Sequence, residues 1–277
     1  MSDTRTHLIA GSSLAMTEDD NKYGKRAPLD RNMKRQTLFI ADLHLAPEQP
    51  QTAQFFFDFL AELDSTKVDA LYILGDLFKL WIGDDDHSQF NETIKEHLSS
   101  AGKRIPIYLM AGNRDFLLGK NFAQTSNCIL IRDPHIIDLY SKPTLLTHGD
   151  ILTSKEIKYR LFRTLLRVPG LQSLFLKLPI TIRLWIAKQL RDYSINRKKG
   201  SINKPHSMEP RPQESKKLLN QFTFVQLIYG HVHQATNGVI TVNNKNIGYI
   251  SLAEWQNSKD TLHYYVLSTT QTPRNNE

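Results

Sequence analysis

Five short hydrophobic runs along the chain are each followed directly by residues of types that bind metal ions. These residues are Asp42-Leu43-His44, Gly75-Asp76, Gly112-Asn113, His148-Gly149 and Gly230-His231-Val232-His233. The runs alternate with stretches of helical character, which is the pattern of an α/β protein with a largely buried sheet. Because open α/β sheets bind ligands just beyond the carboxyl ends of their strands, we expect these side chains to converge.

The expected strands fall into two groups. The first group alternates with helices and comprises residues 37–41, 70–74, 105–111, 136–140, 144–147 and 225–229. Beyond residue 225 the pattern is richer in β-forming residues, at 239–242, 247–252 and 262–267. We therefore expect a second sheet that packs on the first.

Residues 153–221 interrupt the strands and are predicted to form helices separated by prolines. Their apolar residues recur at near-helical spacing, and the polar, lysine-rich part from 194 to 216 is predicted to be a mobile loop. The chain thus divides into a disordered N-terminal extension (1–36), a core (37–152 and 222–270) and an inserted, basic helical lid (153–221).

The net charge of +7 is distributed unevenly along the chain. Residues 155–217 carry 16 Lys or Arg and four acidic residues, a local excess of +12, so the rest of the chain sums to −5. This excess favours an anionic partner at the insert, and a solvated helical face explains it equally well.

The single cysteine, Cys128, lies in the apolar run 128–131. One cysteine allows no disulfide framework, so we expect this thiol to lie in a buried strand and the protein to work in a reducing cytoplasm. No stretch approaches the roughly 18 consecutive apolar residues of a spanning helix, and we expect no membrane crossing.

Each ligand motif alone is a weak signal, because a single His or Asp-X-His is more often structural than metal-binding. The ordered set is specific, and it resembles the calcineurin-like metallophosphoesterase family over about residues 37–255. The resemblance implies a four-layer α/β sandwich, in which two packed mixed β-sheets are flanked by helices, with an inserted helical lid. It also implies two metal sites, with ligands Asp42, His44 and His233 for one ion, Asn113, His148 and His231 for the other, and Asp76 as the bridge.

Mixed carboxylate and imidazole ligands suit Mn, Fe or Zn better than Ca, but ligand type alone cannot choose among these three metals. We expect two divalent ions, with Mn²⁺ favoured. Two cations roughly 3.5–4 Å apart can hold a hydroxide and neutralise a phosphoryl group during in-line attack. The residues expected to be catalytic are Asp42, His44, Asp76, Asn113, Arg114 and His148. A degenerate fold with inactive ligands is disfavoured, because no ligand position is missing.

Arg114 occupies the place in the third motif where many members of this broad family have His. Arginine cannot act as a general acid near neutral pH because its pKa lies above about 12, but it can neutralise charge. We therefore predict a good leaving group, such as the phosphate of a pyrophosphate bond.

Longer strings at 75–86 and 112–120, together with 38–45 and 148–150, closely resemble the UDP-2,3-diacylglucosamine hydrolases (pyrophosphatases) of lipid A biosynthesis. This resemblance implies attack of metal-bound hydroxide on the α-phosphate of UDP-2,3-diacylglucosamine, which gives UMP and 2,3-diacylglucosamine 1-phosphate (lipid X). It implies substrate-binding roles for Asn113, Arg114, Glu156, Tyr159, Ser194, Lys198, Lys199 and His231. The family has Asp where this chain has Glu156, and in the last motif Val232 and Gln234 replace the common Thr and Arg.

A substrate with two acyl chains and a diphosphate needs an apolar groove with cations at its rim. Burying methylenes contributes about 0.8 kcal/mol each, so partly enclosed acyl chains would supply most of the affinity. The residues expected in the groove are Leu161, Leu165, Leu174, Phe175 and Trp185. Alternatively, these residues only pack the insert onto the core. We expect such an enzyme to be a peripheral protein on the cytoplasmic face of the inner membrane.

Three other functions remain open from the sequence. A different dinuclear-metal pyrophosphatase or phosphodiesterase, acting on nucleotide anhydrides, would be favoured by a polar insert, but this insert is rich in Leu, Ile and Phe. A nuclease is less favoured because the basic segment lacks interleaved aromatic residues, and no nucleic-acid partner is expected. A membrane-binding module that no longer catalyses is opposed by the complete set of ligands.

Overall fold

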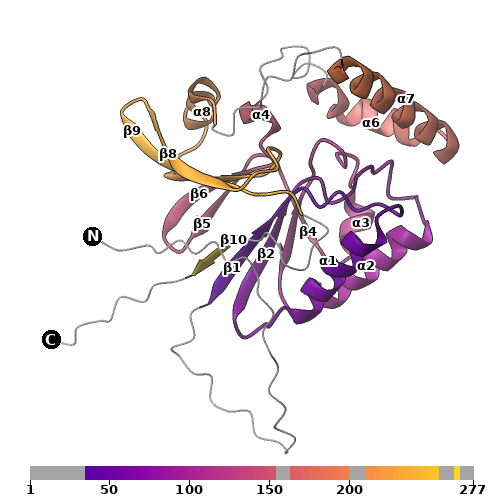
Figure 1. The fold of residues 1–277 in the computed structure, drawn as a ribbon, viewed down its shortest axis with the longest axis horizontal. Helices are drawn as coiled ribbons and strands as arrows, with labels where there is room; N and C mark the ends of the chain where they lie inside the picture. Colours follow the sequence, from indigo (N-terminus) through magenta and orange to yellow (C-terminus); the bar gives the residue numbers. More distant parts are fainter. Residues whose placement is uncertain (1–34, 154–162, 200–209, 256–264, 269–277) are drawn as a thin grey trace, which may run out of the picture.

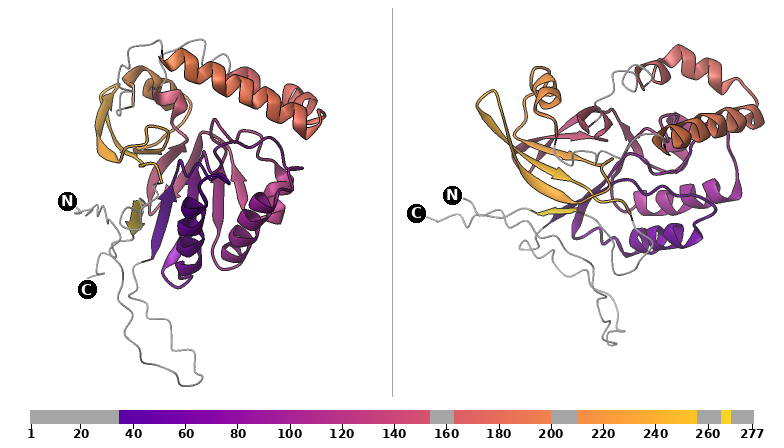
Figure 2. Two further views of the ribbon diagram at one scale, coloured as in Figure 1. Left: turned by 45° about the vertical axis from the view of Figure 1, so that its right-hand side comes forward. Right: turned by 45° about the horizontal axis from the view of Figure 1, so that its top comes forward.

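Two five-stranded β-sheets lie face to face at the centre of the molecule (Figure 1). The computed structural model describes residues 35–153, 163–199, 210–255 and 265–268. Helices cover the outer face of each sheet, so the layers run helix, sheet, sheet, helix (Figure 2). This arrangement confirms the four-layer sandwich that the sequence predicts.

The first sheet has the strand order β10-β1-β2-β3-β4. Its strands are β1 (Gln36–Ile40), β2 (Val68–Leu74), β3 (Ile107–Met110), β4 (Ile129–Ile131) and β10 (Tyr265–Ser268). Strands β1 to β4 run parallel, whereas β10 is antiparallel to β1. The carboxyl ends of β1, β2 and β3 therefore lie at one edge of the sheet, and the first three ligand motifs begin there.

The second sheet has the order β5-β6-β7-β9-β8. Its strands are β5 (His135–Leu139), β6 (Lys142–Thr147), β7 (Gln226–Tyr229), β8 (Thr236–Val242) and β9 (Lys245–Ser251). The three central strands β6, β7 and β9 run parallel, and β5 and β8 are antiparallel to their neighbours. The last two ligand motifs follow β6 and β7.

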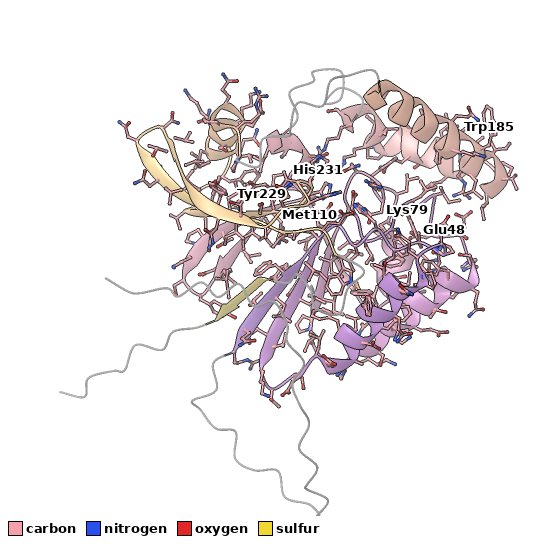
Figure 3. All side chains as sticks on the ribbon, in the orientation of Figure 1. Glu48, Lys79, Met110, Trp185, Tyr229 and His231 are labelled. Atoms are coloured by element: carbon pink, nitrogen blue, oxygen red, sulfur yellow. The ribbon has the colours of Figure 1, made fainter. Side chains whose placement is uncertain are left out.

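The side chains of β1 alternate between two hydrophobic cores, because successive residues of a strand point to opposite faces. Phe39 belongs to the core between the two sheets, which also contains Met110 (Figure 3). Leu38 and Ile40 belong to the core between the first sheet and its helices. Both faces of β1 are buried, which explains why the strand is an almost continuous apolar run.

Five of the helices in the described residues cover the two sheets. The first sheet is covered by α1 (Pro50–Glu62), α2 (Gln89–Gly102) and α3 (Lys120–Thr125), and the second by α4 (Asp150–Thr153) and α8 (Pro212–Leu219). In α1, Phe56 and Leu60 share one face because they are four residues apart, and both are fully buried. In α8, Leu218 packs into the core on the outer face of the second sheet.

The inserted segment contributes α6 (Pro169–Leu176) and α7 (Ile180–Lys199), which lie beside the edge from which the ligand loops emerge (Figures 1 and 2). Arg183 of α7 joins this segment to the core. Its side chain is only 1% exposed and donates to the carbonyl oxygen of Ile82 and to the Asp85 carboxylate. Among the described helices, none is long and apolar enough to span a bilayer.

Two expectations about local structure were wrong. The predicted loop over 194–216 is helical at both ends, because α7 extends to Lys199 and α8 begins at Pro212. Cys128 is buried, but it lies directly before β4 rather than in a buried strand. Because β4 is an edge strand, its first residue, Ile129, is 48% exposed.

Candidate metal centre

Loops that follow β1, β2, β3, β6 and β7 bring the predicted ligands together at the common edge of the two sheets. The carboxylates of Asp42 and Asp76 and the ring of His148 are almost completely removed from solvent. Burying charged and polar side chains away from water is costly unless they are paired or bind an ion. The arrangement is therefore typical of a site built for cations.

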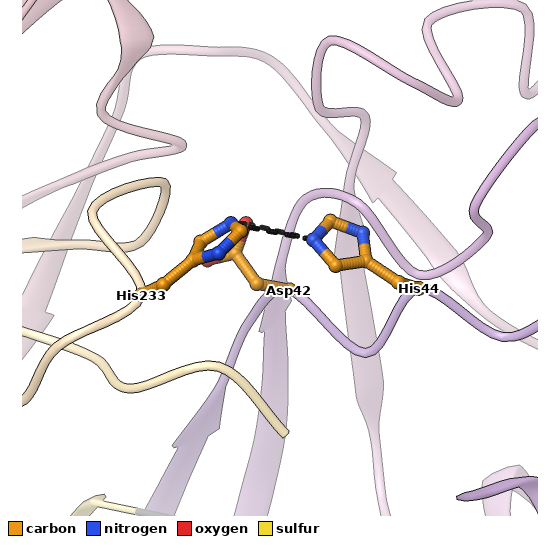
Figure 4. Close-up of side chains that lie close together, drawn as sticks. All are labelled: Asp42, His44 and His233. Atoms are coloured by element: carbon orange, nitrogen blue, oxygen red, sulfur yellow. Dashed lines mark hydrogen bonds and ion pairs between the residues drawn. The ribbon is translucent and has the colours of Figure 1, made fainter. Parts of the chain in front are cut away.

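The first candidate cluster consists of Asp42, His44 and His233 (Figure 4). The Nε2 atoms of the two histidines are 3.3 Å apart, and the Nε2 atom of His233 lies 3.5 Å from Oδ1 of Asp42. One ligand atom from each residue lies within 4.8 Å of the others. Within the described part of the chain, the buried Asp42 Oδ1 has no hydrogen-bond partner, so a cation would satisfy it.

The second candidate cluster consists of Asp42, Asp76 and His148. Nε2 of His148 lies 3.8 Å from Oδ1 of Asp76 and 2.9 Å from Oδ1 of Asn113. The carbonyl of Leu74 can only accept a hydrogen bond, so the Nδ1 atom of His148, 3.0 Å away, carries the proton. A metal ion would displace any proton from Nε2 and bind its lone pair, while Nδ1 keeps its proton for Leu74.

Electrostatics make the second cluster attractive to a cation. Burial lowers the pKa of His148, but the carboxylates of Asp76 and Asp42 outweigh burial and raise it to about 9. Burial, and then the charge of His148, lower the pKa of His231 to about 3. The carboxylates thus stabilise positive charge beside Asp76, and His231 stays neutral, the form in which imidazole binds metals.

His231 lies beside this cluster without belonging to either three-residue group. Its ring lies edge-on to that of His148, with centroids 5.1 Å apart, and its backbone N–H donates to Oδ2 of Asp42 at 2.7 Å. The hydrogen bond from His231 holds the Asp42 carboxylate in place.

The backbone at these ligand positions differs from the sequence-based expectation. An Asp-X-His sequence directly after a strand would be extended, so that its alternate side chains point the same way, but the φ angles of Asp42 and His44 are +55° and +51°. Asp76, His231 and His233 also have positive φ, which is costly for residues other than glycine. The backbone N–H groups of Asp42 and His44 donate to the carbonyls of Gly75 and Asp76, which holds the first two loops together.

Arg114 lies next to the carboxylate of Asp76. Its Nε is 3.3 Å from Oδ2 of Asp76, its backbone N–H donates to Oδ1 of the same residue, and its side chain is 37% exposed. A guanidinium that is partly open to solvent can contact an incoming phosphate while it stays anchored to Asp76.

Several residues that shape the site were not identified as such from the sequence. Asp115 is completely buried and accepts hydrogen bonds from the backbone N–H groups of Gly112 and Phe78, which fixes the third ligand loop. Burial, and then the charge of Asp76, raise its pKa to about 7. Glu254 lies 3.2 Å from His233. Its position shortly after β9, at the same sheet edge, was the signal that could have revealed it.

Positive charges of the insert pair with buried carboxylates beside the site. Arg163 contacts both Asp133 and Asp150, with N–O distances of 2.6 and 2.5 Å. Oδ1 of Asp133 in turn accepts a hydrogen bond from the backbone N–H of His148. Some basic residues of the insert therefore form ion pairs within the protein. A bound anion and a solvated helical face were the only reasons expected from the sequence for the excess of positive charge.

The substrate-binding residues expected in the insert stay predictions. Glu156 and Tyr159 lie outside the described residues. Ser194, Lys198 and Lys199 belong to the last turns of α7, and their side chains are outside the described part of the chain.

Comparison with known proteins agrees with the geometry, because it places the chain among phosphoesterases that bind metal ions. A sequence profile of the calcineurin-like phosphoesterases matches residues 36–235. A UDP-2,3-diacylglucosamine hydrolase of Coxiella burnetii (strain Dugway 5J108-111) is 38% identical over 230 residues, which cover 83% of this chain and 93% of the relative. The chain belongs to this family of phosphoesterases.

Two further relatives with the same name extend the match. The protein of Actinobacillus succinogenes is 41% identical over 72% of this chain and 83% of its own length. The protein of Cellvibrio japonicus is 40% identical over 79% of this chain and 90% of its own length. The predicted family is thus confirmed, and the chain is a metal-dependent hydrolase.

Proposed function

We propose that the chain hydrolyses the pyrophosphate bond of UDP-2,3-diacylglucosamine and releases UMP and 2,3-diacylglucosamine 1-phosphate in lipid A biosynthesis. The observation that carries the proposal is the position of two candidate metal clusters beside an insert with exposed apolar side chains. The names of the relatives support it.

The candidate ligands fit two divalent ions, and we propose Mn²⁺. When bound, such ions lower the pKa of a water molecule and neutralise phosphate charge. Asp42 and Asp76 supply the negative charge that allows two cations to lie close together. The imidazoles of His44, His148, His231 and His233 and the amide of Asn113 complete the ligand set. Arg114 neutralises the phosphate and donates no proton, because a phosphate leaving group needs none.

The insert provides exposed apolar surface for the acyl chains. Leu165, Leu174 and Trp185 are 52%, 63% and 63% exposed. Phe175 instead packs against the core on the helix side of the first sheet, and Leu161 lies outside the described residues. The exposed residues are available for an acyl-chain groove, whereas Phe175 packs the insert onto the core, so each of the two hypotheses describes part of this set.

The decisive experiment is incubation with UDP-2,3-diacylglucosamine and Mn²⁺ in H₂¹⁸O, followed by mass spectrometry. Attack on the α-phosphate places ¹⁸O in UMP and none in the lipid monophosphate. Asp76→Asn serves as the inactive control. No turnover with metal present would exclude the proposed substrate, and faster turnover of an alkyl phosphomonoester would contradict the role of Arg114.

UDP-N-acetylglucosamine, which lacks the two acyl chains, is the control substrate for the insert. We expect its kcat/KM to be at least about 100-fold lower, because each buried methylene contributes about 0.8 kcal/mol. Equal turnover of the two compounds would favour a general hydrolase of nucleotide anhydrides.

We further propose that the protein binds as a peripheral protein to the cytoplasmic face of the inner membrane through α6 and α7. Trp185 lies on the far side of α7 from the sheets (Figure 3). Trp185→Ser should reduce co-sedimentation with phosphatidylethanolamine and phosphatidylglycerol vesicles. Val239→Ser, at the equally exposed Val239 of β8, is the matched control and should have no effect.

A further inference from the structure

Glu254 lies in a short segment that links the end of β9 to the first ligand cluster. On one side of this segment, the backbone N–H of Leu252 donates to the carbonyl of Tyr229, at the end of β7. On the other, the backbone N–H of Trp255 donates to the carbonyl of Asp42 at 3.2 Å. The segment is thus attached to the loops that carry the first and the last ligands.

The ring of Trp255 fixes this segment in the hydrophobic core. It is 3% exposed and meets Phe56 and Phe59 of α1 edge-on, with centroids 6.0 and 5.3 Å away. Because its neighbour is held in this way, the backbone of Glu254 has little freedom to move away from the cluster.

The Glu254 carboxylate contacts the His233 ring at the nitrogen that faces away from the cluster, while its other oxygen, Oε1, lies farther off, 3.7 Å from Nε2 of His44. Oε2 lies 3.2 Å from Nδ1 of His233, while Nε2 of the same ring lies 3.5 Å from Asp42 and 3.3 Å from His44. The two nitrogens of His233 therefore have different partners: Nδ1 faces a carboxylate, and Nε2 faces the candidate metal position.

We infer that Glu254 is a positioning residue that accepts the Nδ1–H of His233 and so directs the Nε2 lone pair at the metal bound by Asp42, His44 and His233. A carboxylate behind a histidine ligand fixes the tautomer and the ring orientation and makes the ligand more basic. This inference rests on the proposed metal centre.

His148 shows why His233 needs this support. The Nδ1–H of His148 donates to the backbone carbonyl of Leu74, and its ring is fully buried, so packing and the main chain fix its orientation. The side chain of His233 is 32% exposed and that of Glu254 39%. At this open side of the site, a side-chain carboxylate does what the main chain does for His148.

The test is a calorimetric titration of metal-free protein with Mn²⁺, which reads metal binding without catalysis. Glu254→Ala should weaken Mn²⁺ binding at one site about 10- to 100-fold. Glu254→Gln, whose amide oxygen can still accept from Nδ1–H, should lose less. Glu48→Ala is the matched control, because Glu48 is also acidic and pairs with Lys79 (Figure 3) without contacting a candidate ligand.

The same substitution in a His233→Ala background separates positioning from other roles. If Glu254 acts through His233, Glu254→Ala should have less than a two-fold effect there. Unchanged Mn²⁺ affinity of the single variant, or an equal loss in both backgrounds, would overturn the inference. Failure of the unaltered protein to bind Mn²⁺ would instead refute the proposed metal centre.

Discussion

The guanidinium of Arg167, in the insert, donates a hydrogen bond from Nη2 to the carbonyl oxygen of Gly112, 3.0 Å away, in the loop that carries Asn113. The same nitrogen contacts the carbonyl of Ala111 at 3.3 Å, and Nη1 lies 3.4 Å from the carboxylate of Asp133. Through this one side chain, the insert is connected to the loop that carries Asn113 and to Asp133, which accepts a hydrogen bond from the backbone N–H of His148.

Arg167→Ala should therefore lower kcat with UDP-2,3-diacylglucosamine by about 10- to 100-fold, because residues that orient metal ligands have effects of this size. The Gly112 carbonyl would lose its partner, and the loop that carries Asn113 would be less fixed. Steady-state kinetics at saturating Mn²⁺ measures the effect. A kcat within two-fold of the unaltered enzyme would show that the insert does not support this loop.

Arg104→Ala is the control for Arg167. The Arg104 guanidinium also donates to main-chain carbonyls, those of Leu60, Ala61 and Leu63 at the end of α1, outside the site. Its removal should lower the free energy of unfolding by about 1 kcal/mol and leave kcat unchanged.

Gly112→Ala should abolish Mn²⁺ binding at the Asp76 carboxylate although it removes no ligand. A Cβ atom at this position would lie 2.2 Å from Oδ1 and 2.4 Å from the backbone nitrogen of Asp76, so Asp76 would have to move. We expect a loss of about 1–3 kcal/mol in the free energy of unfolding, measured with urea. Gly170→Ala is the control, because no atom lies within 4 Å of the added Cβ. Full metal occupancy of the Gly112 variant would contradict the prediction.

Cys128 should be unreactive in the folded protein. Burial raises the pKa of its thiol to about 11, so at pH 8 only about one molecule in a thousand carries the nucleophilic thiolate. Because this pKa is above the unfolded value of about 9, the contribution of the thiol to stability is complete below pH 9 and is lost as the pH rises towards 11. Ellman's reagent should react within minutes only after addition of urea, and rapid reaction without urea would disprove burial.

The convergence of the ligands was predictable from the sequence, but the backbone that achieves it was not. Asp42, Asp76 and His148 each follow a buried strand, and parallel strands end at one edge. The left-handed conformation of Asp42 and His44 carries no sequence signal, because glycine is the residue expected at positive φ.

Contacts between distant segments also lay beyond sequence reasoning. Glu254 meets His233 because β9 lies beside β7, a pairing that strand patterns alone do not specify. From the sequence, the basic residues of the insert were expected either to bind an anion or to face solvent. In the structure, Arg163 and Arg183 instead pair with carboxylates of the core. A charge count cannot distinguish these cases, since all of them have the same composition.

Arg183→Ala should loosen α6 and α7 without removing metal from the core. Arg183 donates to the carbonyls of Leu178 and Ile82 and pairs with Asp85. Losing a buried partner costs about 3–5 kcal/mol in a fully buried pair, and we expect about 2 kcal/mol because the Asp85 side chain is 55% exposed. Hydrogen exchange should accelerate in residues 169–190 only, and KM should rise while Mn²⁺ affinity is unchanged.

Lys188→Ala, at an exposed position of the same helix, is the control for Arg183 and should change neither exchange nor KM.

The ion pair between Arg183 and Asp85 also predicts a pH dependence of the exchange rate. The hydrogen bond from Arg183 lowers the pKa of Asp85, so the pairing stabilises the insert above pH 4 and is lost as the pH falls through the lowered pKa. Acid should therefore accelerate exchange in α6 and α7 of the unaltered protein, after correction for the intrinsic rate. Arg183→Ala should abolish this acid effect, because the acid response requires the ion pair, and an equal response in both proteins would assign it to other carboxylates.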